Sequence, residues 1–79
     1  MAVQVEWFAT LVKRTRSRQP TTHVEWRPGL TPMDILREEG FSDVDAESVM
    51  PVLDDEQLSL TSSIPDGATL RFIVSISGG

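Results

Sequence analysis

The chain has 79 residues, of which 39% are hydrophobic and 24% are charged, and its formal net charge is −5. This length suits one domain with a small core, which leaves little room for an enclosed active site. The sequence has no cysteine and a single histidine, His23. That composition excludes disulfides, thiolate metal sites and iron–sulfur clusters, and we predict no metal site.

The start of the chain and the distribution of charge bear on where the protein works. No basic segment followed by an apolar stretch opens the sequence, and no apolar run approaches the roughly 20 residues that span a bilayer. We therefore expect a cytoplasmic protein without a membrane partner. Residues 34–66 contain ten acidic residues against one basic residue, Arg37. Such an acidic surface disfavours nucleic acid as a partner.

Two strands are expected in the first third of the chain. Residues 3–8 alternate apolar and polar side chains until Phe8, an aromatic residue on what should be the polar face. Residues 21–26 are rich in β-branched and aromatic residues and predict a second strand. The tryptophan in each strand is expected in the core or on the sheet face. The basic segment 13–19 has no clear period, which indicates a solvated, mobile loop of about ten residues between the strands.

The strongest helix signal covers residues 32–39. Thr31 suits the N-cap, Pro32 suits the first helical position, and Asp34 places an acidic residue in the first turn. Gly40 is a natural C-terminal stop. We therefore expect one short helix at this point of the chain.

The segment after the helix is harder to interpret. Residues 41–48 are acidic and are expected to be irregular, whereas residues 49–53 form an apolar run typical of a strand. Pro51 suggests that this strand lies at a sheet edge or ends there, because proline has no amide hydrogen to donate to a neighbour. After a short acidic turn, residues 57–60 alternate again and predict another strand.

The last strand has the clearest pattern in the chain. It follows a predicted turn at residues 64–67, where proline presets the first turn angle and glycine accepts a positive φ. Its inward-facing side chains are all apolar: Leu70, Phe72, Val74 and Ile76. Ile73 is an apolar exception on the opposite face, which otherwise carries polar side chains.

The order of these elements predicts the fold. Two strands, a helix and three further strands indicate an α+β protein in which the helix covers one face of a mixed sheet. The β-grasp, or ubiquitin-like, fold has this order, with four to five strands packed on one short helix and the first and last strands parallel at the centre. We expect a β-grasp domain over residues 1–74 and a flexible C-terminal tail over residues 75–79.

The tail ends in Gly78-Gly79. Because glycine has no Cβ, such a pair can extend into a channel too narrow for other residues. Together with residues 5–11 and residues 58–72, this ending resembles the MoaD/ThiS family of ubiquitin-like sulfur carrier proteins, MoaD-like members more than ThiS-like ones. The chain departs from the family at residues 54–57, where members often carry an Asn-Gly turn, and before the tail, where they often carry prolines.

The resemblance implies a carrier and not an enzyme. The carboxylate of Gly79, with Gly78 beside it, would be adenylated and converted to a thiocarboxylate that donates sulfur in cofactor biosynthesis of the molybdopterin, tungstopterin or thiamin type. No cofactor would be bound, because a ubiquitin-activating-type adenylating enzyme, MoeB-like or ThiF-like, uses the ATP and Mg²⁺. The second partner would be a sulfur-accepting synthase, MoaE-like or thiazole-synthase-like, and the free protein would be a monomer.

Three apolar residues are candidates for partner contacts. Phe8 and Ile73 are out of phase with the inward-facing residues of their strands, and would lie together on the open sheet face if the first and last strands are neighbours. The resemblance implies that this face meets the adenylating enzyme, with Leu60 as a third contact; scattered surface hydrophobicity is the alternative.

Two other functions stay open: a protein modifier linked through Gly79 to lysines, and a binding module that acts through its acidic surface.

Overall fold

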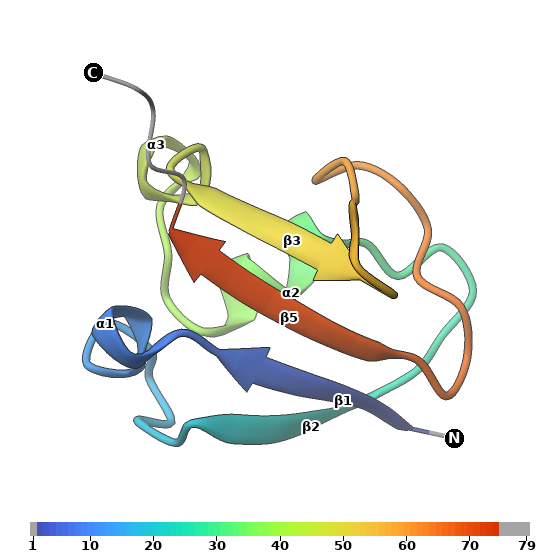
Figure 1. Cartoon of the computed structure of the whole chain (residues 1–79), viewed down its shortest axis with the longest axis horizontal. Helices are drawn as coiled ribbons and strands as arrows, with labels where there is room; N and C mark the ends of the chain where they lie inside the picture. The colour runs from blue at the N-terminus through green and yellow to red at the C-terminus, as the bar shows by residue number, and fades with distance from the viewer. Residues whose placement is uncertain (1, 75–79) are drawn as a thin grey trace.

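A mixed sheet forms the body of the protein, described by a computed structural model for residues 2–74 (Figure 1). Within that range the sheet has five strands: β1 (Ala2–Trp7), β2 (Thr21–Glu25), β3 (Val49–Leu53), β4 (Glu56–Gln57) and β5 (Thr69–Val74). Their spatial order is β2-β1-β5-β3-β4. β1 and β5 pair in parallel, and the other neighbours pair antiparallel. The predicted α+β, β-grasp arrangement is confirmed.

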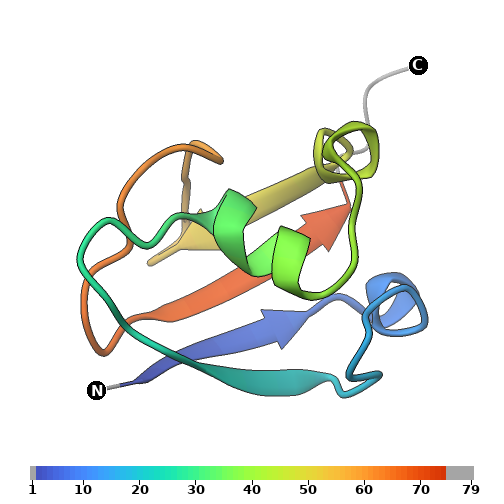
Figure 2. The ribbon, with the colours of Figure 1, turned by 180° about the vertical axis from the view of Figure 1, so that it is seen from behind.

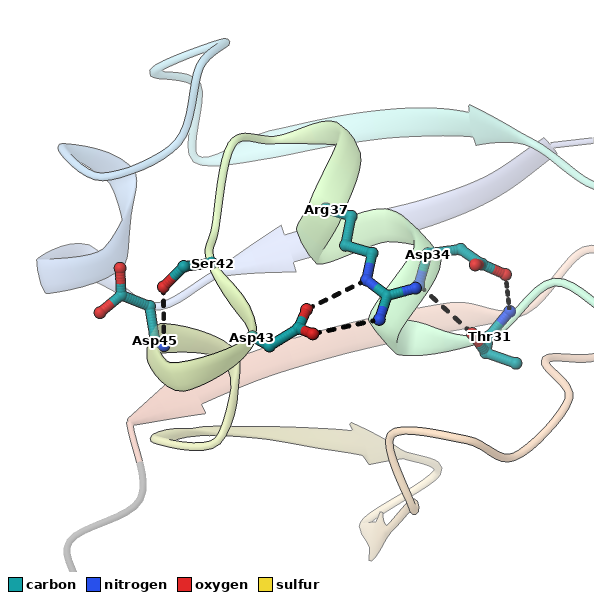
Figure 3. A network of polar contacts seen from close by, with 6 residues as sticks. All are labelled: Thr31, Asp34, Arg37, Ser42, Asp43 and Asp45. Carbon is teal, nitrogen blue, oxygen red and sulfur yellow. Dashed lines mark hydrogen bonds and ion pairs between the residues drawn. The ribbon is translucent and has the colours of Figure 1, made fainter.

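The helix that covers the sheet, α2 (Pro32–Glu38), begins where the sequence predicts it. The Thr31 hydroxyl accepts a hydrogen bond from the Asp34 amide (3.2 Å), and the Asp34 carboxylate accepts one from the Thr31 amide (3.1 Å; Figure 3). This reciprocal capping box satisfies two amides that the first helical turn leaves unpaired. Gly40 follows the helix with a φ of 92°, as expected for a glycine stop.

The core lies between α2 and one face of the sheet. Its largest components include an aromatic stack, in which the Trp7 ring lies 4.7 Å from Phe72 and 5.9 Å from Phe41. Ile35 and Leu36 from α2 are at most 1% exposed and close this layer. Trp26 is half-buried and donates a 2.7 Å hydrogen bond from Nε1 to the Ile64 carbonyl. Both tryptophans therefore lie in or against the core, as predicted.

Two short helices stand where irregular chain was expected. α1 (Ala9–Val12) follows β1 directly, and α3 (Asp43–Ala46) is capped by Ser42, whose hydroxyl accepts from the Asp45 amide at 3.1 Å (Figure 3). Each has four residues, which is too short for a periodic apolar pattern to appear in the sequence. Each buries one apolar side chain, Leu11 or Ala46, so tertiary packing stabilises them.

The basic segment after α1 is exposed, as predicted, except at Thr15, and contacts with neighbouring helices hold it in place. The Arg14 guanidinium lies 3.0 Å from Asp45 and 5.4 Å from the centre of the Phe41 ring. The Glu39 carboxylate accepts hydrogen bonds from both the amide and the hydroxyl of Ser17. These contacts attach the segment to α3 and to the end of α2. The whole connection between β1 and β2 spans residues 8–20 and contains α1.

The predicted strand at 57–60 is mostly wrong, because β4 has only two residues, Glu56–Gln57. Pro51 lies in the middle of β3, not at its end, and pairs with Phe72 on the β5 side. The Pro51 carbonyl accepts a hydrogen bond from the Leu58 amide (2.8 Å), on the side of β3 that faces β4. In an antiparallel strand the nitrogen of a residue points to the same side as its carbonyl, so the Pro51 nitrogen also faces β4, which has only two residues. That side of β3 is nearly an edge, which explains why proline is tolerated there.

The turn before β5 forms one residue later than predicted. The Ala68 amide donates to the Pro65 carbonyl (3.3 Å), so proline occupies the first turn position and not the second. Gly67 has a φ of 77°, as the sequence predicts for this glycine.

Candidate functional site

The candidate reactive end, Gly78 and Gly79, lies outside the described residues, as does the rest of segment 75–79. The described chain reaches Val74, the last residue of β5. β5 is held on one side by β1, with Phe72 opposite Trp7, and on the other by β3, with Val74 opposite Val49. The point from which the C-terminal segment continues is thus fixed by hydrogen-bonded ladders on both sides of a central strand.

Phe8 and Ile73 lie next to each other on neighbouring strands. The Phe8 amide donates to the Phe72 carbonyl (2.9 Å), which extends the β1–β5 ladder one step beyond the end of β1. Since Trp7 and Phe72 face the core, strand alternation directs the residues that follow them, Phe8 and Ile73, to the face that α2 leaves open. Phe8 is 50% exposed and Ile73 is half-buried. Their expected neighbourhood on the open face is confirmed, whereas their contact with a partner stays a prediction.

Two further apolar residues adjoin this pair, and sequence reasoning missed them. Met50 lies opposite Ile73 in the β3–β5 ladder, and Val52 lies opposite Arg71, both half-buried on the open face. In β3, Met50 and Val52 alternate with Val49 and Pro51, which are buried on the core side. Because all four residues are apolar, this alternation is not visible in the sequence. We call this set the apolar patch: Phe8, Met50, Val52 and Ile73.

Polar pairs border the apolar patch on the same face. Arg71 lies 3.3 Å from Glu6, and the Gln4 amide group donates to the other carboxylate oxygen of Glu6 at 3.2 Å. An apolar centre beside exposed charged groups is the usual composition of a protein–protein contact surface. The patch lies toward the end of β5, where the chain continues to Gly79.

Leu60 does not belong to the apolar patch. It is half-buried and packs against the core cluster, and its carbonyl accepts a hydrogen bond from the Met33 amide in the first turn of α2 (3.1 Å). A partner contact at Leu60 therefore stays a prediction without support from its surroundings.

Small-molecule and metal sites are poorly supported by the described part of the chain. A hollow of about 230 Å³ lies over the β3–β4 turn, between Asp54, Asp55 and Arg71. Residues 2–74 contain no group of three histidine, cysteine or acidic side chains arranged to hold a metal ion. No helix in this range is both long enough and apolar enough to cross a membrane.

Comparison with known proteins identifies the fold. No family model and no curated protein matches the chain. Among solved structures, SAMP1 from Haloferax volcanii is 18% identical with a TM-score of 0.72, and the match covers 100% of both chains. A Pyrococcus furiosus protein provisionally named molybdopterin converting factor, subunit 1, is 13% identical (TM-score 0.68) over 96% of this chain and 99% of its own. A second H. volcanii structure, small archaeal modifier protein 1, is 15% identical (TM-score 0.71) over 95% and 98%.

At these identities the similarity concerns the fold. The three neighbours share the arrangement described above, and the match extends along nearly the whole of each chain. The chain therefore has the ubiquitin-like β-grasp fold of the MoaD/ThiS type that its sequence predicts.

Proposed function

We propose that the protein is a sulfur carrier whose reactive group is the C-terminal carboxylate of Gly79. In the first step the carboxylate attacks the α-phosphorus of ATP, and pyrophosphate leaves, which produces an acyl adenylate. In the second step hydrosulfide attacks the acyl carbon and AMP leaves, which produces a thiocarboxylate. A protein persulfide can replace hydrosulfide if a thiol then reduces the acyl disulfide formed. The adenylating enzyme provides the ATP and Mg²⁺ site, so the carrier is not itself an enzyme.

The observation that carries this proposal is the position of β5. The strand that leads to Gly78-Gly79 lies at the centre of the sheet, between β1 and β3. Five residues follow Val74, and an extended chain of that length spans at most about 17 Å. A terminal carboxylate at that distance from a rigid sheet can enter the active site of a second protein while the domain stays outside it.

The apolar patch supports the choice of partner. It lies on the open face beside the end of β5, so a protein that binds this face is close to the carboxylate it must activate. We assign the patch to the adenylating enzyme and, after activation, to a synthase that accepts the sulfur. Donation in cofactor biosynthesis of the molybdopterin, tungstopterin or thiamin type belongs to this proposal.

The test is a mass measurement. The intact protein, first shown by mass to end at Gly79, is incubated with the cognate adenylating enzyme, ATP, Mg²⁺ and a sulfur donor. We expect a mass increase of one oxygen-to-sulfur exchange, located in the C-terminal peptide. A variant without Gly79 and a variant with one residue added after it should keep the fold and lose the exchange. An unchanged mass with an active enzyme contradicts the proposal.

A second candidate function, protein modification, is favoured by the name of one structural neighbour, small archaeal modifier protein 1. In this alternative the acyl carbon of Gly79 is attacked by a lysine amine of a target protein, and an amide forms. High-mass adducts that resist thiol reagents would favour it. Lys13 is the single lysine of the sequence. If one copy of the protein can be attached to a lysine of another copy, Lys13→Arg should abolish these self-conjugates.

A further inference from the structure

β2 is an edge strand with unused backbone hydrogen-bonding groups. It pairs with β1 only, within the described part of the chain. The Trp7 amide donates a hydrogen bond to the Pro20 carbonyl (2.8 Å). In an antiparallel pair only every second residue of a strand bonds to its neighbour, so the next residues of β2 that bond to β1 are Thr22 and Val24. The amides and carbonyls of the alternate residues, Thr21, His23 and Glu25, therefore point away from the sheet. They form no hydrogen bond with any other residue in 2–74.

A groove runs beside this edge, between β2 and α2. Its volume is about 270 Å³. Its apolar lining is formed by Val24, which is half-buried, and by the buried Ile35 of α2, with Thr22 beside them. Figure 2 shows α2 over the middle of the sheet, with β2 at the margin beyond it. A strand added to β2 would therefore direct every second side chain into this groove.

The rim of the groove is acidic. It carries the carboxylates of Glu25, Glu38 and Glu39. Of these, Glu38 lies 3.6 Å from Arg27, with both side chains more than half exposed, and Glu39 is bound by the uncharged Ser17. Arg27 is the one cation that forms an ion pair with these three carboxylates among residues 2–74, so two of the three negative charges have no ion-pair partner there.

We propose that β2 and the β2–α2 groove form a binding site for an extended, basic peptide segment of another protein. The segment adds to the sheet as a sixth strand through the backbone of Thr21, His23 and Glu25. Its aliphatic side chains enter the groove over Val24 and Ile35, and its alternate lysines or arginines lie on the opposite face beside Glu25. Basic residues at the ends of the segment, beyond the groove, lie near Glu38 and Glu39. Five residues of β2 offer an edge of about 17 Å, which suits a segment of five to six residues.

Charge argues against a second copy of the chain as the occupant. If two β2 strands paired across a twofold axis, the acidic rims of both copies would approach each other, and like charges at an interface oppose association. A basic segment removes this conflict. The site does not involve Gly78 or Gly79, so it is independent of the proposed sulfur-carrier function.

The probe is a capped hexapeptide of alternating lysine and valine, and the measurement is amide hydrogen exchange by NMR on the full-length protein. Binding should slow exchange at His23 and Glu25 at least tenfold, because their amides gain acceptors. Exchange at Thr22 and Val24, whose amides already bond to β1, should change little. The control is a peptide of the same charge in which alternate backbone amides are methylated, so that it cannot pair with the edge of β2. This peptide should not slow amide exchange at His23 and Glu25 relative to Thr22 and Val24.

Matched variants test the contribution of the rim. The double variant Glu25→Gln and Glu38→Gln should weaken binding of the lysine–valine peptide at least fivefold. Glu47→Gln, an exposed glutamate after α3, should change it less than twofold. Equal binding of the methylated peptide, or no protection at His23 and Glu25 at saturation, overturns the proposal. So does sedimentation that shows the protein pairing with itself through β2 in preference to the peptide.

Discussion

Replacing Phe8 with alanine tests the assignment of the apolar patch. Aromatic side chains bury about 150–250 Å² when fully covered, and Phe8 is 50% exposed, which leaves roughly 100 Å² for a partner to cover. At about 25 cal/mol per Å² this area contributes about 2.5 kcal/mol to docking. Alanine retains a small part of it, so we expect a loss of about 2 kcal/mol, or roughly 30-fold in Kd for the adenylating enzyme.

Pyrophosphate release during adenylation is the assay. Phe8→Ala should raise KM for the carrier by roughly the same factor and leave kcat nearly unchanged, because the side chain contributes to docking and does not touch the reacting carboxylate. Val44→Ala is the matched control, since Val44 is 76% exposed but lies on α3, outside the apolar patch. It should change KM less than twofold.

Two results would refute the reasoning. If Phe8→Ala and Val44→Ala have the same small effect on KM, the enzyme does not dock on the apolar patch. If Phe8→Ala lowers kcat at saturating carrier, the residue affects the chemical step and is not a simple docking contact. Denaturant unfolding of both variants, done in parallel, shows that each is folded at the assay temperature.

Three further predictions concern stability and are measured by denaturant or thermal unfolding. Thr31→Ala removes the acceptor for the Asp34 amide and should cost about 1 kcal/mol, or a fall in Tm of about 4–8 °C; no change would mean that the capping box does not stabilise α2. Gly40→Ala should lower the free energy of unfolding by about 1–2 kcal/mol, because a residue with a side chain disfavours the φ of 92° even though no atom blocks the added methyl group. An unchanged free energy of unfolding would contradict the positive φ. The double variant Asp54→Asn and Asp55→Gly should raise the free energy of unfolding by about 0.5–1 kcal/mol, because both residues of this hairpin turn have a positive φ, which Asn-Gly adopts readily. A lower free energy of unfolding would mean that the acidic pair makes stabilising contacts beyond the turn.

Features encoded by local chemistry could be predicted from the sequence. The start of α2 follows from three neighbouring residues, Thr31, Pro32 and Asp34, whose preferences agree. The two faces of β5 follow from the alternation of its apolar and polar side chains, which Ile73 alone breaks in residues 69–74. The confirmed parallel pairing with β1 follows from the order of the elements. Phe8 and Ile73 were recognisable because each interrupts such an alternation.

Features that depend on tertiary packing could not. β4 stops at Gln57 because Leu58 and Leu60, which alternate like strand residues, pack against the core instead. Met50 joins the apolar patch only through its pairing with Ile73, which no local pattern reveals. The unpaired edge of β2 likewise follows from the spatial strand order and not from the residues of β2 themselves.

The central position of β5 also determines how the protein responds to mechanical force. A pull applied beyond Val74 acts along the strand, and the ladders to β1 and β3 resist it together, because their hydrogen bonds lie across the direction of the pull. The edge strand β4 pairs with β3 alone in the described sheet, over two residues, so the same pull applied to β4 would meet fewer bonds. A motor that engages the chain by its C-terminal end therefore meets the most resistant part of the sheet first, whereas a partner that only threads the end into its active site leaves the domain folded.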